Sequence, residues 1–106
     1  MSFEVRSVKG IEQYFADEAL SGDPLRMHIS QVPPGERPHP PHQHGGFEAF
    51  YMLEGEGTLE IGDEQVVVKA NQAVVFDPTR LHGLVNTGSV PMCYMVIIAH
   101  KEEPKQ

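Results

Sequence analysis

Several features that would place the chain in a large functional class are scarce in its sequence. It has a single cysteine, Cys93, so it can form neither a disulfide within the chain nor a cysteine-based zinc site. Lys and Arg number only 8 against 15 Asp and Glu. The resulting formal charge of −7 disfavours phosphate backbones and anionic lipid surfaces. We therefore expect no nucleic-acid partner and no membrane partner.

Long hydrophobic runs are also missing. The longest apolar stretch, residues 92–99, is far shorter than the roughly 20 residues that a membrane-spanning helix needs. The first residues, Met1 to Arg6, have no apolar run after a basic end, so no targeting segment is expected. These observations predict a cytoplasmic protein. The 106 residues, 40% of them hydrophobic, are enough for one domain with one core.

Turn-forming residues, by contrast, are frequent. Nine prolines and ten glycines divide most of the chain into runs of strand length. No helical crossover separates these runs, which argues against a parallel sheet and predicts an all-β sandwich or small barrel. The expected strands cover residues 25–30, 47–53, 58–61, 65–68, 73–76, 81–85 and 92–99.

The N-terminal part has a different pattern. Residues 11–20 contain acidic residues and alanine and end at the turn sequence Ser-Gly-Asp-Pro, which predicts a short helix. We therefore expect an N-terminal segment over residues 1–24, with a strand and this helix. A barrel over 25–100 and a charged tail over 101–106 complete the chain.

Histidine is the residue type that points to chemistry. Six are present, and His39, His42 and His44 lie close together in a proline-rich stretch. His42 and His44 are two positions apart, so on extended backbone both rings point to one face and can converge on a metal ion. Glu48 has the same parity but would lie about 20 Å from His42 on a straight strand. The pair Gly45-Gly46 lies between them, where a bend is least costly.

A fourth ligand must come from elsewhere, and His82, after a turn and at the start of a strand, is the best candidate. These residues resemble the cupin superfamily. Gly35 followed by His-x-His-x3-Glu-x6-Gly, from His42 to Gly55, is similar to its first motif, and His82-x3-Asn86 is similar to the end of its second. The match differs from the family pattern in two respects. The spacing from Gly35 to His42 is one residue longer than usual, and Asp77 and Thr79 stand where the second motif usually has Pro and Gly.

The resemblance implies a small single-domain cupin. The expected fold is a double-stranded β-helix, or jelly-roll barrel, formed by most of the chain. It also implies one divalent transition metal held by His42, His44, Glu48 and His82. Imidazole and carboxylate ligands do not choose among iron, manganese, nickel, zinc and copper.

Each candidate also has an ordinary structural interpretation. The His-Pro stretch can be a solvated loop stiffened by proline, and His82 can be a satisfied core histidine. His39 lies outside the motif, where an exposed position or one beside the ligands is expected. His28 faces opposite to Met27 and Ile29, so it is either a surface residue or a catalytic proton-transfer group pointing into the cavity.

Strand parity extends the prediction to the surroundings of the site. If Glu48 faces the interior, then Phe50 and Met52 face it too and line the cavity. The opposite face of the same strand is also apolar and must be covered. Either a second subunit covers it, which predicts a homodimer through a sheet face, or the N-terminal segment does so with Phe3, Val5 and Val8. The outer-face residues are Phe47, Ala49, Tyr51 and Leu53.

Two functions from different classes follow. The first is a mononuclear metalloenzyme, of dioxygenase or isomerase type, that acts on a small polar organic substrate. The second is a non-catalytic module that uses its metal to bind a small ligand such as a sugar or metabolite. A barrel without metal is a third possibility, which the full ligand set disfavours.

Overall fold

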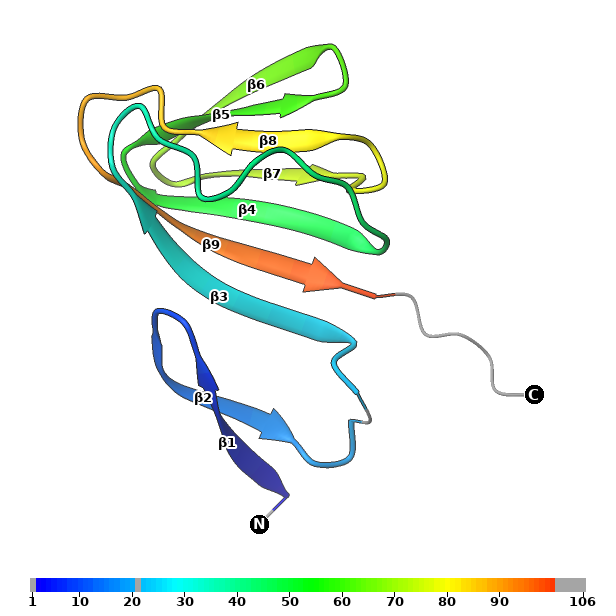
Figure 1. Cartoon of the computed structure of the whole chain (residues 1–106). Coiled ribbons are helices and arrows are strands. Elements are labelled where there is room, and N and C mark those ends of the chain that lie inside the picture. Colours follow the sequence, from blue (N-terminus) through cyan, green and yellow to red (C-terminus); the bar gives the residue numbers. More distant parts are fainter. Residues whose placement is uncertain (1, 21, 101–106) are drawn as a thin grey trace.

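The computed structural model describes residues 2–20 and 22–100 and contains nine strands and no helix within them (Figure 1). Most turns fall at the glycines and prolines that break up the sequence. The strands are β1 (Phe3–Val8), β2 (Ile11–Asp17), β3 (Leu25–Val32), β4 (Phe47–Glu54), β5 (Glu56–Ile61), β6 (Glu64–Lys69), β7 (Gln72–Phe76), β8 (His82–Val85) and β9 (Met92–Ala99).

Strands β3 to β9 form a jelly roll of two antiparallel sheets, and the predicted fold class is therefore confirmed. The larger sheet has the order β3-β9-β4-β7, and the smaller has the order β6-β5-β8 (Figure 1). Apolar side chains from both sheets form one core. Its buried members are Val32, Phe50, Met52, Leu59, Ile61, Val68, Phe76, Leu84, Met92, Tyr94 and Val96.

The short helix predicted at residues 11–20 is wrong. Residues Ile11–Asp17 form β2, which pairs antiparallel with β1 through a turn at Gly10, where φ is +77°. The preceding residues, Phe3–Val8, supply a strand partner of matching length, and aromatic residues such as Tyr14 and Phe15 favour extended backbone. Pairing with a neighbouring segment therefore outweighs the helical composition of the segment.

The register of the larger sheet determines which side chains lie next to one another across the strands on its inner face. One row consists of Arg26, Ile98, Glu48 and Phe76, and the next consists of His28, Val96, Phe50 and Val74. The predicted parity of β4 is confirmed, because Glu48, Phe50 and Met52 are all buried on this face. Its inner face therefore carries both the core and the polar residues of the candidate site.

The β1–β2 hairpin lies beside β3, the edge strand of the larger sheet (Figure 1). It is attached near its tip, where the N–H of Ile29 donates to the carbonyl oxygen of Lys9 at 2.9 Å. The contact is close, since a Cβ at Gly10 would lie 2.7 Å from that of Ile29. The charged tail predicted at 101–106 lies outside the described residues, and the described part has no helix able to span a membrane.

Candidate metal centre

The loop between β3 and β4 carries the clustered histidines and is fastened to the start of β8. The backbone N–H groups of His42 and His82 each donate to the other's carbonyl oxygen at 2.9 Å. The N–H of His44 also donates to the carbonyl oxygen of Pro78 at 2.8 Å. These three bonds place the rings of His42 and His44 beside that of His82, although 40 positions separate His42 from His82.

The chain bends between His44 and Glu48, as the sequence predicts. The bend lies at Gly46, where φ is +93°, a value that favours glycine. A side chain at Gly46 would also collide with the backbone, because a Cβ there would lie 2.6 Å from the carbonyl oxygen of Ala99. The bend turns the start of β4 back toward the histidine loop.

The structure brings all four predicted ligands together. One ring nitrogen from each of His42, His44 and His82 lies within 4.8 Å of the others. The Oε1 atom of Glu48 lies 2.8 Å from Nε2 of His44 and 3.4 Å from Nε2 of His82. Ligand atoms bound to one ion at about 2.1 Å and at right angles are about 3 Å apart, so the Glu48 distances suit a shared ion.

Backbone carbonyl groups fix the protonation of two of these rings. The Nδ1–H group of His82 donates to the carbonyl oxygen of Arg80 at 2.8 Å, and that of His44 donates to Gly45 at 2.9 Å. A neutral ring that carries its proton on Nδ1 has a bare lone pair on Nε2. Nε2 of His82 faces the carboxylate of Glu48 in this way without a hydrogen bond, and Nε2 of His44 lies at hydrogen-bond distance from the same oxygen, so a cation between these atoms would bind all three.

Burial also favours a cation here. Glu48 and His82 are 5% and 2% exposed, and Nε2 of His82 has no hydrogen-bond partner among the described residues. A buried polar atom without a partner is costly and calls for an explanation. A divalent ion satisfies the atom and neutralises the carboxylate. The donor set therefore fits a metal ion.

The remaining two histidines of the loop are more accessible. His42 is exposed, and its ring centroid lies 4.8 Å from that of His82 and 4.2 Å from that of His39. Partial desolvation of the ring first, and then the neighbouring histidines, lower the pKa of His42 although the residue is exposed overall, which favours the neutral ring that a metal needs. His39 donates from Nδ1 to the carbonyl oxygen of Pro40 and lies outside the cluster of ligand nitrogens, as expected.

The cavity that contains these ligands has a volume of about 210 Å³ and an aromatic wall. Phe50 lines it, and the ring centroid of Phe76 lies 4.9 Å from that of His82. Tyr94 also faces the cavity, and burial raises its pKa to about 12, so its hydroxyl keeps its proton. Met52 shares the buried face of β4 but lies deeper in the core, outside the cavity lining.

His28 lies on the cavity wall, so the structure supports the inward of its two predicted orientations. Burial first, and then the charges of Lys9 and Arg26, lower the pKa of His28. Sequence reasoning missed Lys9, which also lines the cavity although it lies in the turn between β1 and β2. Nothing in the local sequence distinguishes this lysine, because its position depends on where the hairpin docks.

Two residues at the second motif have structural roles. Asp77 accepts hydrogen bonds from the backbone N–H and the hydroxyl of Thr79, at 3.0 and 2.7 Å, which makes a tight turn without the usual glycine. These bonds, the hydroxyl first, lower the pKa of Asp77. Asn86 is buried and is hydrogen-bonded to the last residue of β3 and to two residues of the loop before β9.

A family model described as Cupin domain matches residues 28–98, and the chain therefore belongs to this family. The predicted resemblance is confirmed. The residues of both motifs, from Gly35 to Asn86, lie within this match. The chain is also 29% identical over 68 residues to an oxalate-binding protein from Thermotoga maritima, a match that covers 64% of this chain and 56% of that protein. It thus spans little more than half the length of that relative.

Solved structures show the same fold. A predicted oxalate decarboxylase from Thermotoga maritima superimposes with a TM-score of 0.67 and 28% identity, over 74% of this chain and 70% of that one. A cupin protein from Bacteroides fragilis superimposes with a TM-score of 0.73 and 17% identity, over 100% of this chain and 91% of that one. The second match includes the N-terminal hairpin and supports the fold alone.

Proposed function

We propose that the chain holds one divalent transition metal through His42, His44, Glu48 and His82 and binds a small organic acid at that metal. The observation that carries the proposal is the meeting of three imidazole nitrogens with a buried carboxylate, where Nε2 of His82 has no hydrogen-bond partner among the described residues. Three neutral imidazoles and one carboxylate leave an octahedral ion two open positions for oxygen donors. Iron, manganese, nickel, zinc and copper all suit this ligand set.

The proposed ligand class draws on charge as well as on similarity. A divalent ion with one carboxylate ligand keeps a net positive charge, which attracts an acidic molecule into the partly apolar cavity. The similar protein from Thermotoga maritima is called an oxalate-binding protein, and oxalate is a small organic acid. The volume of about 210 Å³ restricts the ligand to a small molecule.

Catalysis on the bound molecule is the second candidate function, and the position of His28 favours it. When bound, the metal would supply Lewis acidity or redox chemistry. His28 is on the cavity wall with a lowered pKa, so near neutral pH its ring is unprotonated and able to accept a proton from a bound molecule. Phe50 and Phe76 would exclude water, as an isomerase or dioxygenase site requires.

Metal content tests the ligand assignment. We expect wild-type protein dialysed against each candidate metal to retain one ion per chain, and His42→Ala, Glu48→Gln and His82→Gln to lose most of it. His39→Gln is the matched control, since it changes a neighbouring histidine outside the cluster. Elemental analysis supplies the measurement, and circular dichroism verifies folding. Equal metal in the wild type and the three ligand variants would show that the assignment is wrong.

Turnover separates the two candidate functions. A metal-loaded protein that is stabilised by an organic acid but releases no product is a binding module. Oxygen consumption, or isomerisation that His28→Asn abolishes without loss of metal, defines an enzyme. The cytoplasmic location stays a prediction.

We also propose that a second copy of the chain covers the outer face of the larger sheet. In the described strands the rows of this face include one charged residue, Glu54, which the bulge in β4 pairs with Cys93 at one end of the face, so two copies of an acidic protein can meet over the rest without burying charge. The hairpin alone does not cover it, because Phe47 and Val75 are 59% and 77% exposed. The face consists of Leu25, Met27, Ile29, Gln31, Phe47, Ala49, Tyr51, Leu53, Ala73, Val75, Cys93, Met95, Ile97 and Ala99.

A further inference from the structure

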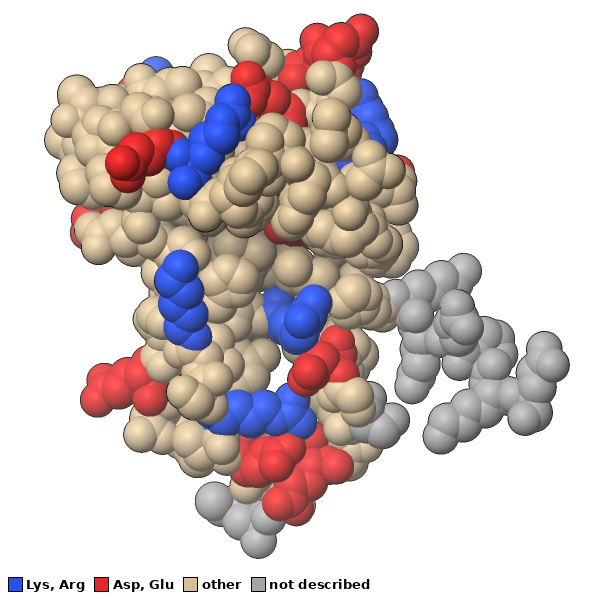
Figure 2. Space-filling view, viewed as in Figure 1, with Lys and Arg blue, Asp and Glu red and all other residues tan. Residues whose placement is uncertain are grey.

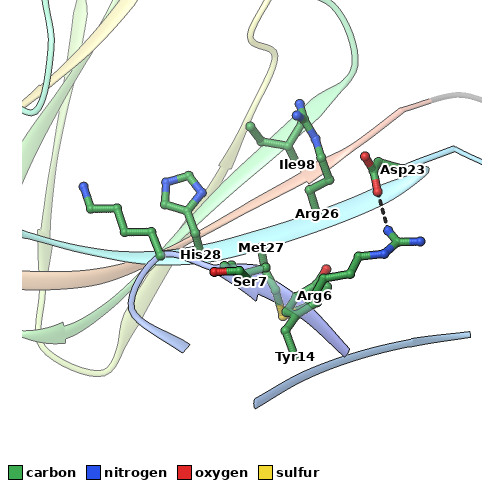
Figure 3. A pocket seen from close by; sticks show the side chains of 10 residues that line it. Arg6, Ser7, Tyr14, Asp23, Arg26, Met27, His28 and Ile98 are labelled. Atoms are coloured by element: carbon green, nitrogen blue, oxygen red, sulfur yellow. Dashed lines mark hydrogen bonds and ion pairs between the residues drawn. The ribbon is translucent and has the colours of Figure 1, made fainter. Parts of the chain in front are cut away.

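A second hollow adjoins the metal cavity. It lies between the β1–β2 hairpin and β3, has a volume of about 470 Å³, and shares Lys9, His28 and Ile98 with the lining of the metal cavity. Figure 3 shows His28, Arg26 and Ile98 projecting to the same side of the sheet, whereas Met27 projects to the other side, toward Tyr14. A molecule in the metal cavity can therefore extend into this outer hollow.

The outer hollow is basic although the chain as a whole is acidic. Lys9 and Arg26 have no carboxylate within ion-pair distance among residues 2–20 and 22–100. Among the described residues, the side chain of Arg26 is hydrogen-bonded to the ring of His100, at 3.3 Å, and to no carboxylate. Arg6 lines the same hollow but is neutralised by Asp23 at 2.6 Å and Glu4 at 2.7 Å, and Figure 3 shows it turned toward Asp23. Figure 2 shows basic side chains on both sides of this hollowed region.

The sheet register places this positive charge at a defined distance from the metal. Arg26 and Glu48 belong to one cross-strand row and are separated only by Ile98. Two strand spacings amount to about 10 Å between their backbones. The long arginine side chain shortens the gap that a ligand must bridge. A molecule anchored at the metal would therefore cross the apolar side chain of Ile98 before it meets Arg26.

We propose that Lys9 and Arg26 form a basic rim that binds the second acidic group of a short-chain dicarboxylate whose first end is bound by the metal. This inference rests on the proposed function and specifies its substrate class. An apolar link of a few carbon atoms suits the surface of Ile98, and a carboxylate suits two cations that lack an acidic partner in the described residues. The hairpin thus becomes part of the binding site, because its turn supplies Lys9.

The position of His28 agrees with this arrangement. Its pKa is lowered by burial and by Lys9 and Arg26, so both cations act on the space that His28 faces. No carboxylate contributes to this shift. His28 lies on β3 two residues from Arg26, one row beside the row that joins Arg26 to Glu48, and it lines both the metal cavity and the outer hollow that a bound diacid would occupy.

Matched pairs of 2-hydroxy acids test the rim. Malate and 2-hydroxybutyrate present the same metal-chelating end and the same number of carbon atoms, but only malate has a second carboxylate. The pair 2-hydroxyglutarate and 2-hydroxypentanoate repeats the comparison with one more carbon. We expect calorimetry on nickel- or zinc-loaded wild type to show at least about tenfold tighter binding of the better diacid than of its mono-acid, as for one charge-assisted hydrogen bond.

Variants assign the preference to the rim. Lys9→Gln and Arg26→Gln should each reduce the diacid preference at least about threefold and leave affinity for the mono-acid unchanged. Lys69→Gln is the control, because it removes an exposed cation on β6 that lines neither the metal cavity nor the outer hollow. The diacid preference of the wild type should also fall as salt is raised from about 50 to 500 mM.

The outcomes separate this inference from the proposal on which it depends. Wild-type protein that retains no metal overturns both. Metal-loaded protein that binds mono-acids and diacids equally at both chain lengths overturns the rim alone. A diacid preference that survives in Lys9→Gln and Arg26→Gln, shown by thermal unfolding to be folded, also overturns it.

Discussion

Asn86 offers a sharp test of the division between residues that hold the fold and residues that hold the metal. It is 1% exposed and lies four positions after His82, within the same motif. Its Nδ2 group donates to the carbonyl oxygens of Val32 at 3.0 Å and Val90 at 2.8 Å, and its Oδ1 accepts from the N–H of Gly88 at 2.9 Å. Asn86 therefore joins the end of β3 to the loop that precedes β9.

Substitution of Asn86 by alanine removes all three bonds. A typical hydrogen bond contributes about 1 kcal/mol net, so Asn86→Ala should lower the free energy of unfolding by about 3 kcal/mol. The carbonyl oxygen of Val32 loses a partner in a buried position, which keeps the loss near this value or above it. For a domain of this size, the melting temperature should fall by at least about 10 °C.

Urea unfolding of the metal-free protein measures this loss without interference from the metal. Gln65→Ala, which removes an exposed amide on β6, is the control and should change the unfolding free energy by less than about 0.5 kcal/mol. Metal content of folded Asn86→Ala should equal that of the wild type, because the side-chain hydrogen bonds of Asn86 go to Val32, Val90 and Gly88 and to none of the four ligands. A variant as stable as wild type, or a stable variant without metal, would refute this reasoning.

Two further predictions concern the assembly and the pH dependence. Sedimentation should show a dimer for wild type, a monomer for Val75→Arg and a dimer for Val67→Arg, an exposed valine on β6; a monomeric wild type would contradict the proposed face. The pKa of His28 is lower in the folded state than in the unfolded state, so the folded state binds fewer protons. The contribution of His28 to stability is therefore complete above about pH 6.5, the pKa of the unfolded state. This contribution is lost as the pH falls through the pKa of the folded state. His28→Asn should therefore flatten the rise of unfolding free energy with pH below about 6.5, and an unchanged slope would contradict this assignment.

The strands from β3 onward could be predicted because each is bounded by local signals. Glycine and proline mark most of their ends, and β9 covers the predicted residues 92–99. The predicted strands at 58–61 and 65–68 likewise lie within β5 and β6, which a two-residue turn at Gly62 and Asp63 joins. The N-terminal region failed because its conformation is decided by pairing between β1 and β2, which local composition does not reveal. Helix and strand preferences differ by less than the gain from such pairing.

The candidate site divides in the same way. His42, His44 and Glu48 lie within seven consecutive positions, so spacing and the bend at Gly46 are enough to bring them together. His82 required the recognised motif, because its place beside His42 depends on the backbone pairing of a loop with β8. Lys9 could not be found, since a turn lysine reaches the cavity only through the docking of the hairpin on β3.

The net charge of the chain and the proposed acidic ligand are compatible for an electrostatic reason. A charge of −7 spread over the surface repels an approaching anion, but salt screens interactions beyond about 8 Å at physiological ionic strength. Within that distance an anion in the outer hollow meets Lys9 and Arg26, and the nearby carboxylates of Glu4 and Asp23 are already paired with Arg6. Arg6 therefore matters although it need not touch the ligand, because it cancels the acidic groups that would otherwise weaken the rim.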